Sequence, residues 1–290
     1  MPSLFDIRQL RRLAERTSPS YLAAEPFPHV VIDGLLDAGL IEAAAKAFPT
    51  PGQIVWYKYE NPLERKLAAN RLDQLPGVIS DILAELNSAE FIEFIESLTG
   101  IPRLIPDPGY IGGGLHQIER GGKVDIHADF NYHPQMNLDR RVNLILFLNE
   151  EWKEEYGGHL ELWDRGMTSA VRSIPPLFNR LVVFNITDDA YHGHPEPLAC
   201  PEGETRKSLA VYYYSDGRPA RERSAPHSTV YQKRPGDPHD PMLDDLRARR
   251  AVRRLADMTT RPDAPGVGGG APSQSPCREA SPHASLRVQG

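Results

Sequence analysis

Three residues of this chain, His127, Asp129 and His192, have the side chains and the spacing to bind one metal ion. In a β-strand, residues i and i+2 point to the same face, so the His127 imidazole and the Asp129 carboxylate face together. His192 follows the apolar run 181–186 across a short polar turn and can supply a third ligand. Two imidazoles and one carboxylate form the facial triad of non-haem Fe(II) oxygenases, which leaves the opposite face of the metal open.

Other residues compete for these roles. A His-X-Asp pair is a weak signal when it stands alone, because a solvated polar loop produces the same pattern. His194 lies two residues after His192, and Asp125 lies on the other side of His127 at the spacing of Asp129. His116 is interpreted as structural.

A second element, Arg206 with Ser208, strengthens the prediction of a site. Both residues stand at alternate positions of the predicted strand 206–215 and therefore share one face with Tyr212, while Lys207 faces the other way. A guanidinium group can hold a carboxylate through two parallel hydrogen bonds, and a hydroxyl can add a third. The alternative is a surface arginine at the start of a strand, where most arginines are exposed.

The elements that must position these residues change character along the chain. Helical spacing dominates the first hundred residues, and the period changes from 3.6 to 2 near residue 103. Capping residues support the helices: Asp37 before the second helix, and Asn87 or Ser88 before the last, which ends at Gly100. The spacing predicts helices over 3–13, 36–48 and 78–98, the last divided in two, and strands over 29–33, 54–59, 114–119, 141–149, 159–163, 180–186 and 206–215.

Several of these strands are apolar on both faces, as in Val142–Leu148. Such a strand needs cover on both sides, which a two-sheet sandwich or barrel with helices outside provides. The predicted fold class is therefore mainly β with flanking α.

At this point the sequence resembles the 2-oxoglutarate- and Fe(II)-dependent dioxygenases, specifically their prolyl 4-hydroxylase-like branch. The resemblance covers about residues 110–216 and rests on an ordered series of landmarks, with Pro26–Asp33 similar to an N-terminal strand of bacterial members. The landmarks are His127-Ala-Asp129, Arg141–Asn149, Gly157–Trp163, Asn179–Phe184, His192-Gly193 and Arg206-Lys-Ser208.

The resemblance implies a double-stranded β-helix (jelly-roll or cupin-like) core packed by N-terminal helices. It implies that His127, Asp129 and His192 bind Fe(II), and that Arg206, helped by Ser208, binds the distal carboxylate of 2-oxoglutarate. The family pattern favours the histidine directly before glycine, so His194 becomes a neighbour of the metal site or of the substrate.

The resemblance also implies the reaction. O2 is consumed, 2-oxoglutarate yields succinate and CO2, and an unactivated C–H bond is hydroxylated, with ascorbate as a candidate reductant. Related halogenases have glycine or alanine at the position of Asp129, so the carboxylate indicates hydroxylation or another oxidation rather than halogenation.

One position departs from the family pattern. Several prolyl hydroxylases present a tyrosine that helps hold 2-oxoglutarate, and the matching position here is Phe147. We expect Asn143, on the same face, or Gln117, on the preceding strand, to supply the polar contact; Asn143 could instead satisfy a buried backbone group. The loop 130–137 either shapes substrate entry or is a plain surface connection.

Four regions follow from these patterns. Residues 1–102 form a helical and strand support region of the same domain, and 103–218 form the oxygenase core. Residues 219–258 are a C-terminal extension with a short basic helix over 244–258. Residues 259–290, rich in Pro, Gly and Ser, cannot bury enough apolar area to offset their ordering entropy and are predicted to be disordered.

Composition excludes several classes. The net charge of −6 gives no basic field for nucleic acid, and no apolar run reaches the ~20 residues that span a bilayer. Only two cysteines occur, Cys200 and Cys277, without metal-type spacing or a disulfide framework, so we expect a reducing, cytoplasmic location.

The predicted partner is a small-molecule or peptidyl substrate: a prolyl residue, an amino acid or a metabolite. No pattern predicts an oligomeric state. A non-catalytic jelly-roll or cupin-like binding module is the alternative from another class, and a zinc hydrolase with the same ligands is a third; neither explains Arg206.

Overall fold

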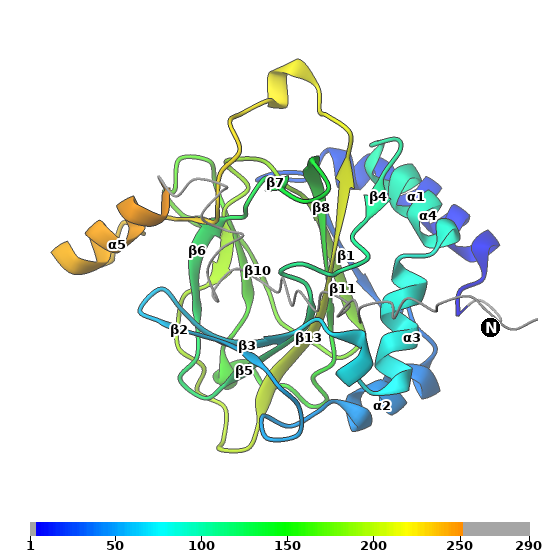
Figure 1. The fold of residues 1–290 in the computed structure, drawn as a ribbon, viewed down its shortest axis with the longest axis horizontal. Helices are drawn as coiled ribbons and strands as arrows, with labels where there is room; N and C mark the ends of the chain where they lie inside the picture. Colours follow the sequence, from blue (N-terminus) through cyan, green and yellow to red (C-terminus); the bar gives the residue numbers. More distant parts are fainter. Residues whose placement is uncertain (1–3, 252–290) are drawn as a thin grey trace, which may run out of the picture.

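An antiparallel sheet that curls around itself forms the centre of the computed structural model, which describes residues 4–251 (Figure 1). Its strands are β1 (His29–Asp33), β2 (Tyr57–Asn61), β3 (Glu64–Ala69), β4 (Ile105–Pro106), β5 (Gly114–Glu119), β6 (Val124–Ala128), β7 (Tyr132–His133), β8 (Leu138–Phe147), β9 (Leu160–Trp163), β10 (Ala170–Ile174), β11 (Arg180–Asn185), β12 (His192–His194), β13 (Thr205–Ser215) and β14 (Val230–Tyr231). The α-helices are α1 (Ile7–Leu22), α2 (Ala38–Ala47), α3 (Gly77–Leu86), α4 (Ala89–Thr99) and α5 (Pro241–Ala251).

The strand order brings distant parts of the sequence together. Hydrogen-bonded neighbours run β1-β11-β8-β13-β5-β3-β6-β12-β9-β10, with β14 on β6, β2 on β3, β4 on β13 and β7 on β8. Strands from the N-terminal region, the predicted core and the C-terminal extension therefore pair within one sheet. His127 lies on β6 and Arg206 lies on β13, and the strands β5 and β3 stand between these two in the sheet.

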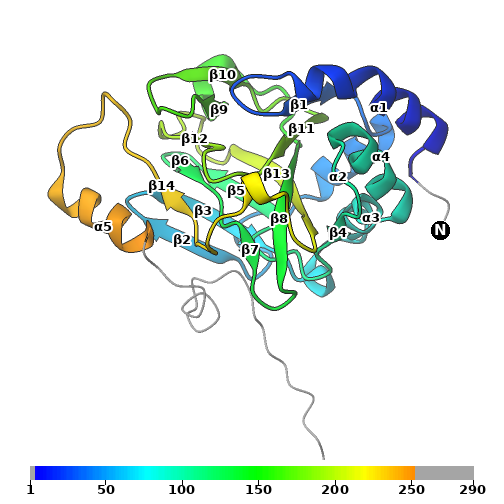
Figure 2. The same cartoon turned by 90° about the horizontal axis from the view of Figure 1, so that it is seen from above.

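Four helices cover one face of this sheet, as Figures 1 and 2 both show for α1, α2, α3 and α4. The expected caps are present: the side chains of Asp37 and Ser88 accept hydrogen bonds from backbone N–H groups of the first turns of α2 and α4. Gly100 ends α4 in the left-handed region at φ 69°, a conformation that glycine adopts without a steric cost. The helices and the outer sheet face bury one shared core, which includes Ile79, Phe91, Leu144, Leu209 and Tyr213.

The inner face of the sheet carries a different set of side chains. Register places Ser208 opposite both Phe147 and His116, so these residues share one face, and Arg206 lies on the same face two positions earlier. A smaller apolar cluster of Phe27, Phe147, Leu162, Val182 and Phe184, with neighbours, fills part of the interior. Apolar side chains on both faces of β8 and β11 thus have the two-sided cover that the sequence predicted.

The structure differs from the predicted elements at several places. The predicted strand 54–59 begins later, as β2, and its partner β3 was not predicted because Glu64, Arg65 and Lys66 interrupt its apolar pattern. The first helix is longer than 3–13, and Pro19 lies inside it. The predicted helix 244–258 begins earlier, as α5; its last residues and the tail 259–290 lie outside the described residues.

The C-terminal extension crosses from the end of β13 to the edge of β6. There β14 pairs in antiparallel register, Val230 with Ala128 and Tyr231 with His127, while α5 lies on the side of the sheet away from α1–α4 (Figure 2). No helix within residues 4–251 is long and apolar enough to cross a membrane.

Candidate metal centre

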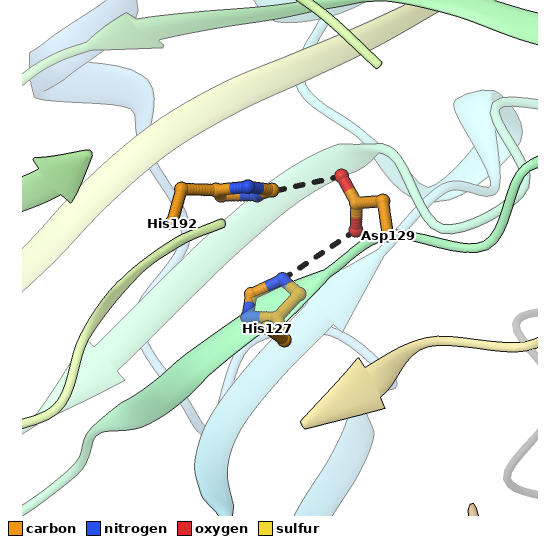
Figure 3. A group of neighbouring side chains, drawn as sticks. All are labelled: His127, Asp129 and His192. Atoms are coloured by element: carbon orange, nitrogen blue, oxygen red, sulfur yellow. Dashed lines mark ion pairs between the residues drawn. The ribbon is translucent and has the colours of Figure 1, made fainter. Parts of the chain in front are cut away.

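His127, Asp129 and His192 meet inside the curled sheet. His127 is the penultimate residue of β6, Asp129 directly follows that strand, and His192 begins β12, where it pairs in register with His127. His127 Nε2 lies 3.5 Å from Asp129 Oδ1, and His192 Nε2 lies 3.4 Å from Oδ2. Figure 3 shows both rings directed at the carboxylate. One potential ligand atom from each residue lies within 4.8 Å of the others, which is a spacing that one metal ion can bridge.

Backbone contacts set the tautomer of both histidines. His127 Nδ1 lies 2.8 Å from the carbonyl oxygen of Asp125, and His192 Nδ1 lies 2.9 Å from that of Ala190. A carbonyl oxygen only accepts, so each Nδ1 carries the proton and each Nε2 presents a lone pair to the centre. Burial, with His127 nearby, also lowers the pKa of His192, which keeps that imidazole neutral. Neutral, oriented imidazoles are the form that binds a metal.

Two neighbours on β8 hold the Asp129 carboxylate. Arg140 Nη2 donates to Asp129 Oδ2 over 2.9 Å, and Asn143 Nδ2 donates to the same oxygen over 3.1 Å. Burial by itself would raise the pKa of Asp129, but the charge of Arg140 and the adjacent His192 and His127 side chains outweigh it and hold that pKa well below the usual value. Asp129 is therefore a carboxylate at neutral pH, as metal ligation requires.

The sequence analysis did not single out Arg140, which is fully buried and stacks its guanidinium 3.5 Å from the centroid of the Tyr212 ring. The available signal was an arginine at the start of a strand that is otherwise apolar on both faces.

Gly193 allows β12 to lie against β6. A Cβ atom at this position would stand 2.8 Å from the carbonyl oxygens of both Val124 and Asp125. These are backbone atoms of the strand that carries His127, so they cannot move aside without shifting the strand. Glycine is thus required after His192 because β12 and β6 approach each other closely at this position.

Arg206 lies deeper in the interior as a buried cation. It is 5% exposed, its Nε donates to Gly158 O over 2.7 Å, and its guanidinium carbon lies 4.8 Å from the centroid of the Phe147 ring. Burial lowers the pKa of Arg206 to about 9, and within the described part of the chain no acidic group acts against this shift. A buried charge without a counter-ion is costly, so this position favours an anionic ligand.

Gly158 makes room for that arginine. It has φ +72°, and a Cβ there would stand 2.5 Å from Leu198 Cδ2 and 3.0 Å from Arg206 Cδ.

The other residues predicted to contact 2-oxoglutarate do not all lie on the inner face of the sheet. Ser208 is buried on the same face as Arg206. Gln117, in contrast, pairs with Lys207 and so lies on the opposite face of the sheet, where its Nε2 donates to Thr205 Oγ1. The expectation that Gln117 contacts 2-oxoglutarate is therefore wrong, because the strand register directs its side chain away from Arg206. The Asn143 amide contacts Asp129 rather than a backbone group.

Among the rival residues, Asp125 and His116 have partners elsewhere. Asp125 accepts from Lys123 over 2.6 Å and from Arg247 over 3.3 Å. Tyr212 donates to Gly112 O. His116 contacts that same carbonyl, and burial lowers the pKa of His116 to about 3. His194 does not belong to the three-residue metal group.

Comparison with known proteins agrees with this geometry. Residues 113–214 match the sequence model of the 2OG-Fe(II) oxygenase superfamily. The fold is similar to that of a prolyl hydroxylase of Trichoplax adhaerens, solved with a peptide fragment of hypoxia inducible factor, at a TM-score of 0.54 and 17% identity over 72% of this chain and 91% of that one. A prolyl 4-hydroxylase of Phytophthora capsici gives a TM-score of 0.47 at 20% identity, over 73% of this chain and 66% of that one.

One curated relative also matches. A prolyl 3-hydroxylase of Mus musculus is 32% identical over 79 residues, which are 26% of this chain and only 14% of the mouse protein.

The fold is thus the predicted double-stranded β-helix, shared with prolyl hydroxylases. Residues 113–214 match the 2OG-Fe(II) oxygenase superfamily, whose cofactor and co-substrate are Fe(II) and 2-oxoglutarate.

Proposed function

We propose that this chain is a 2-oxoglutarate-dependent dioxygenase that hydroxylates an unactivated C–H bond. The observation that carries the proposal is the pairing of two features in one interior. Two lone-pair nitrogens and one carboxylate converge at one point. On the inner face of the same sheet lies a buried guanidinium that has no acidic partner in the part of the chain that the structure describes.

Each residue has a distinct task in this proposal. His127, Asp129 and His192 hold Fe(II), Arg140 and Asn143 keep the Asp129 carboxylate charged and oriented, and Arg206 with Ser208 receives the distal carboxylate of 2-oxoglutarate. When bound, iron and 2-oxoglutarate supply the activation of O2, with succinate and CO2 as co-products; the protein contributes orientation and electrostatics.

For the substrate we propose a prolyl residue in a peptide. The support is analogy: one relative is a prolyl 3-hydroxylase, and the Trichoplax enzyme was solved with a peptide. Fold likeness does not determine a substrate, so free amino acids and small metabolites belong in the same screen. A cytoplasmic location and ascorbate as reductant complete the proposal; a reducing compartment keeps iron ferrous.

The test is succinate formation from 2-oxoglutarate by the purified full chain with Fe(II), first without substrate and then with a peptide and metabolite panel. We expect His127→Ala and Asp129→Ala to abolish turnover and to weaken metal binding by more than about 100-fold, beyond the usual effect of removing a residue behind a ligand. The matched control is His239→Ala, whose imidazole lies at the surface. Unchanged turnover in the two ligand variants would contradict the assignment.

A non-catalytic jelly-roll binding module is the second candidate. It predicts either that the protein binds no iron or that it binds iron and forms no succinate with any substrate. The uncompensated charge of Arg206 disfavours it, since a module that does not bind an anion has no use for that charge.

A further inference from the structure

His194 is a buried histidine that has no hydrogen-bond partner within residues 4–251. Its side chain is 4% exposed, and neither Nδ1 nor Nε2 has a partner among the described residues. Buried polar side chains are nearly always hydrogen-bonded, and an unpaired one carries the full cost of its desolvation. Two unpaired nitrogens on one ring therefore indicate a ligand that the protein is built to receive.

The position of His194 indicates which ligand. It stands at the end of β12, two residues after His192, so its ring belongs to the same interior and yet lies outside the three-residue metal group. Register pairs His194 with Val124, which packs in one cluster with Ile118, the register partner of Arg206. His194 therefore lies in the part of the interior that holds Arg206, whose charge also contributes to the lowered pKa of His194, after burial.

The other nitrogen groups of this region already have partners. Lys66 lies 3.6 Å from Glu64 and 4.8 Å from the centroid of the Tyr59 ring, and His116 contacts Gly112 O. Arg206 and His194 are left with unused donor capacity. An imidazole and a guanidinium in the same part of the interior are together complementary to a single carboxylate, which has two acceptor oxygens.

We propose that His194 is a co-substrate-binding residue that donates a hydrogen bond to the distal carboxylate of 2-oxoglutarate, beside Arg206. This inference rests on the proposed function and adds to it a recognition contact from the strand that also carries a metal ligand. It couples the two ends of the pocket, because β12 then contacts both the metal and the far carboxylate.

Calorimetric titration of the full chain with 2-oxoglutarate tests the proposal, with Zn(II) in the site as a redox-inert ion. Loss of a hydrogen bond to a charged group corresponds to about a 10- to 100-fold rise in Kd, which we expect for His194→Val. His194→Gln keeps a donor and should recover part of the affinity. His159→Val is the matched control, because the His159 ring contacts Ser173 instead. Zn(II) affinity should be the same in all four proteins.

A second measurement separates ligand binding from a structural role. His194→Val removes two unpaired polar atoms from the interior, so the ligand-free variant should unfold at the same or a higher temperature than the wild type. In the wild type, the ring N–H of His194 should become observable and protected from exchange when 2-oxoglutarate is added to the Zn(II) form.

The outcomes are distinct. Tight binding by the wild type together with unchanged Kd in His194→Val overturns this inference and leaves the proposed function intact. A variant with lowered thermal stability and unchanged Kd shows a structural histidine and also overturns it. Absence of 2-oxoglutarate binding by the wild type overturns the proposed function, and this inference with it.

Discussion

The guanidinium of Arg140, which is fully buried, donates a hydrogen bond to Oδ2 of Asp129 across 2.9 Å. The same oxygen accepts from Asn143, and Oδ1 faces His127. Oδ2 is thus held by Arg140 and Asn143 and lies 3.4 Å from His192 Nε2, while Oδ1 faces only His127 among the two imidazoles. This arrangement orients Asp129 before any metal binds.

Replacing Arg140 with methionine should weaken metal binding by about 10- to 100-fold, the usual cost of losing a group that orients a ligand. It should also destabilise the fold by about 3–5 kcal/mol, since it breaks a buried charge pair. Metal titration and thermal unfolding measure the two effects, and Arg221→Met, at an exposed arginine, is the control. Unchanged metal affinity would show that Asp129 needs no support from Arg140.

Gly193→Ala should separate the strands that carry the two histidines. The added Cβ would stand 2.8 Å from two backbone oxygens of β6, and overpacking of this kind costs about 1–3 kcal/mol. We expect lower stability together with weaker metal binding. Gly52→Ala is the control, because nothing lies within 4 Å of a Cβ there. If both variants behave alike, close packing of β12 on β6 is not required.

Arg206→Met should stabilise the ligand-free protein and abolish its binding of 2-oxoglutarate. The charged form of Arg206 is disfavoured by burial, which lowers its pKa to about 9. A base with a lowered pKa destabilises the fold most at low pH, and the penalty declines as the pH rises through the folded pKa. The gain in unfolding temperature should therefore shrink above pH 9. A variant less stable than the wild type at pH 7 would contradict this account.

The C-terminal extension should be held across the metal site in a pH-dependent way. His227 Nε2 contacts Asp188, in the turn before His192, over 3.0 Å, and His227 N donates to Asn131, which follows Asp129 closely. Burial, and Arg218 nearby, lower the pKa of His227, but hydrogen bonds to Asp188 and Ser228 O outweigh them and raise it. The pKa of Asp188 is lowered, mainly by its hydrogen bond from His227.

The contact between His227 and Asp188 is then strongest between about pH 4 and about pH 6.5, which are the ordinary pKa values of an aspartate and a histidine. A base with a raised pKa contributes stability below its unfolded pKa and loses it as the pH rises through the folded value, whereas the acid loses its contribution as the pH falls. Amide exchange of residues 224–228 should therefore accelerate above the folded pKa of His227, and His227→Gln should remove this dependence. A His227 titration midpoint at or below 6.5 would contradict it.

Much of the candidate site followed from local patterns. The i, i+2 spacing of His127 and Asp129 is a property of any strand, and the same alternation correctly separated Arg206 and Ser208 from Lys207. Asp37, Ser88 and Gly100 marked helix ends because capping depends on a few neighbouring residues. The residues that the sequence analysis missed or misplaced depend on other strands. Arg140 meets Asp129 only because β8 lies across the interior from the end of β6, and Gln117 faces away only because of the β5–β13 register.

By itself, then, the sequence indicated the candidate metal ligands and the candidate anion-binding arginine, through residue type, strand alternation and family resemblance. It also indicated the class of fold, because a period of two or 3.6 is a local quantity. Only the tertiary structure decided what surrounds them. Arg140 and Asn143 share one oxygen of Asp129, Gly193 lets the strands of His127 and His192 lie close together, and His194 is buried with no hydrogen-bond partner among residues 4–251. These facts depend on which strands become neighbours, and that choice is made by the burial of the whole sheet rather than by any one segment.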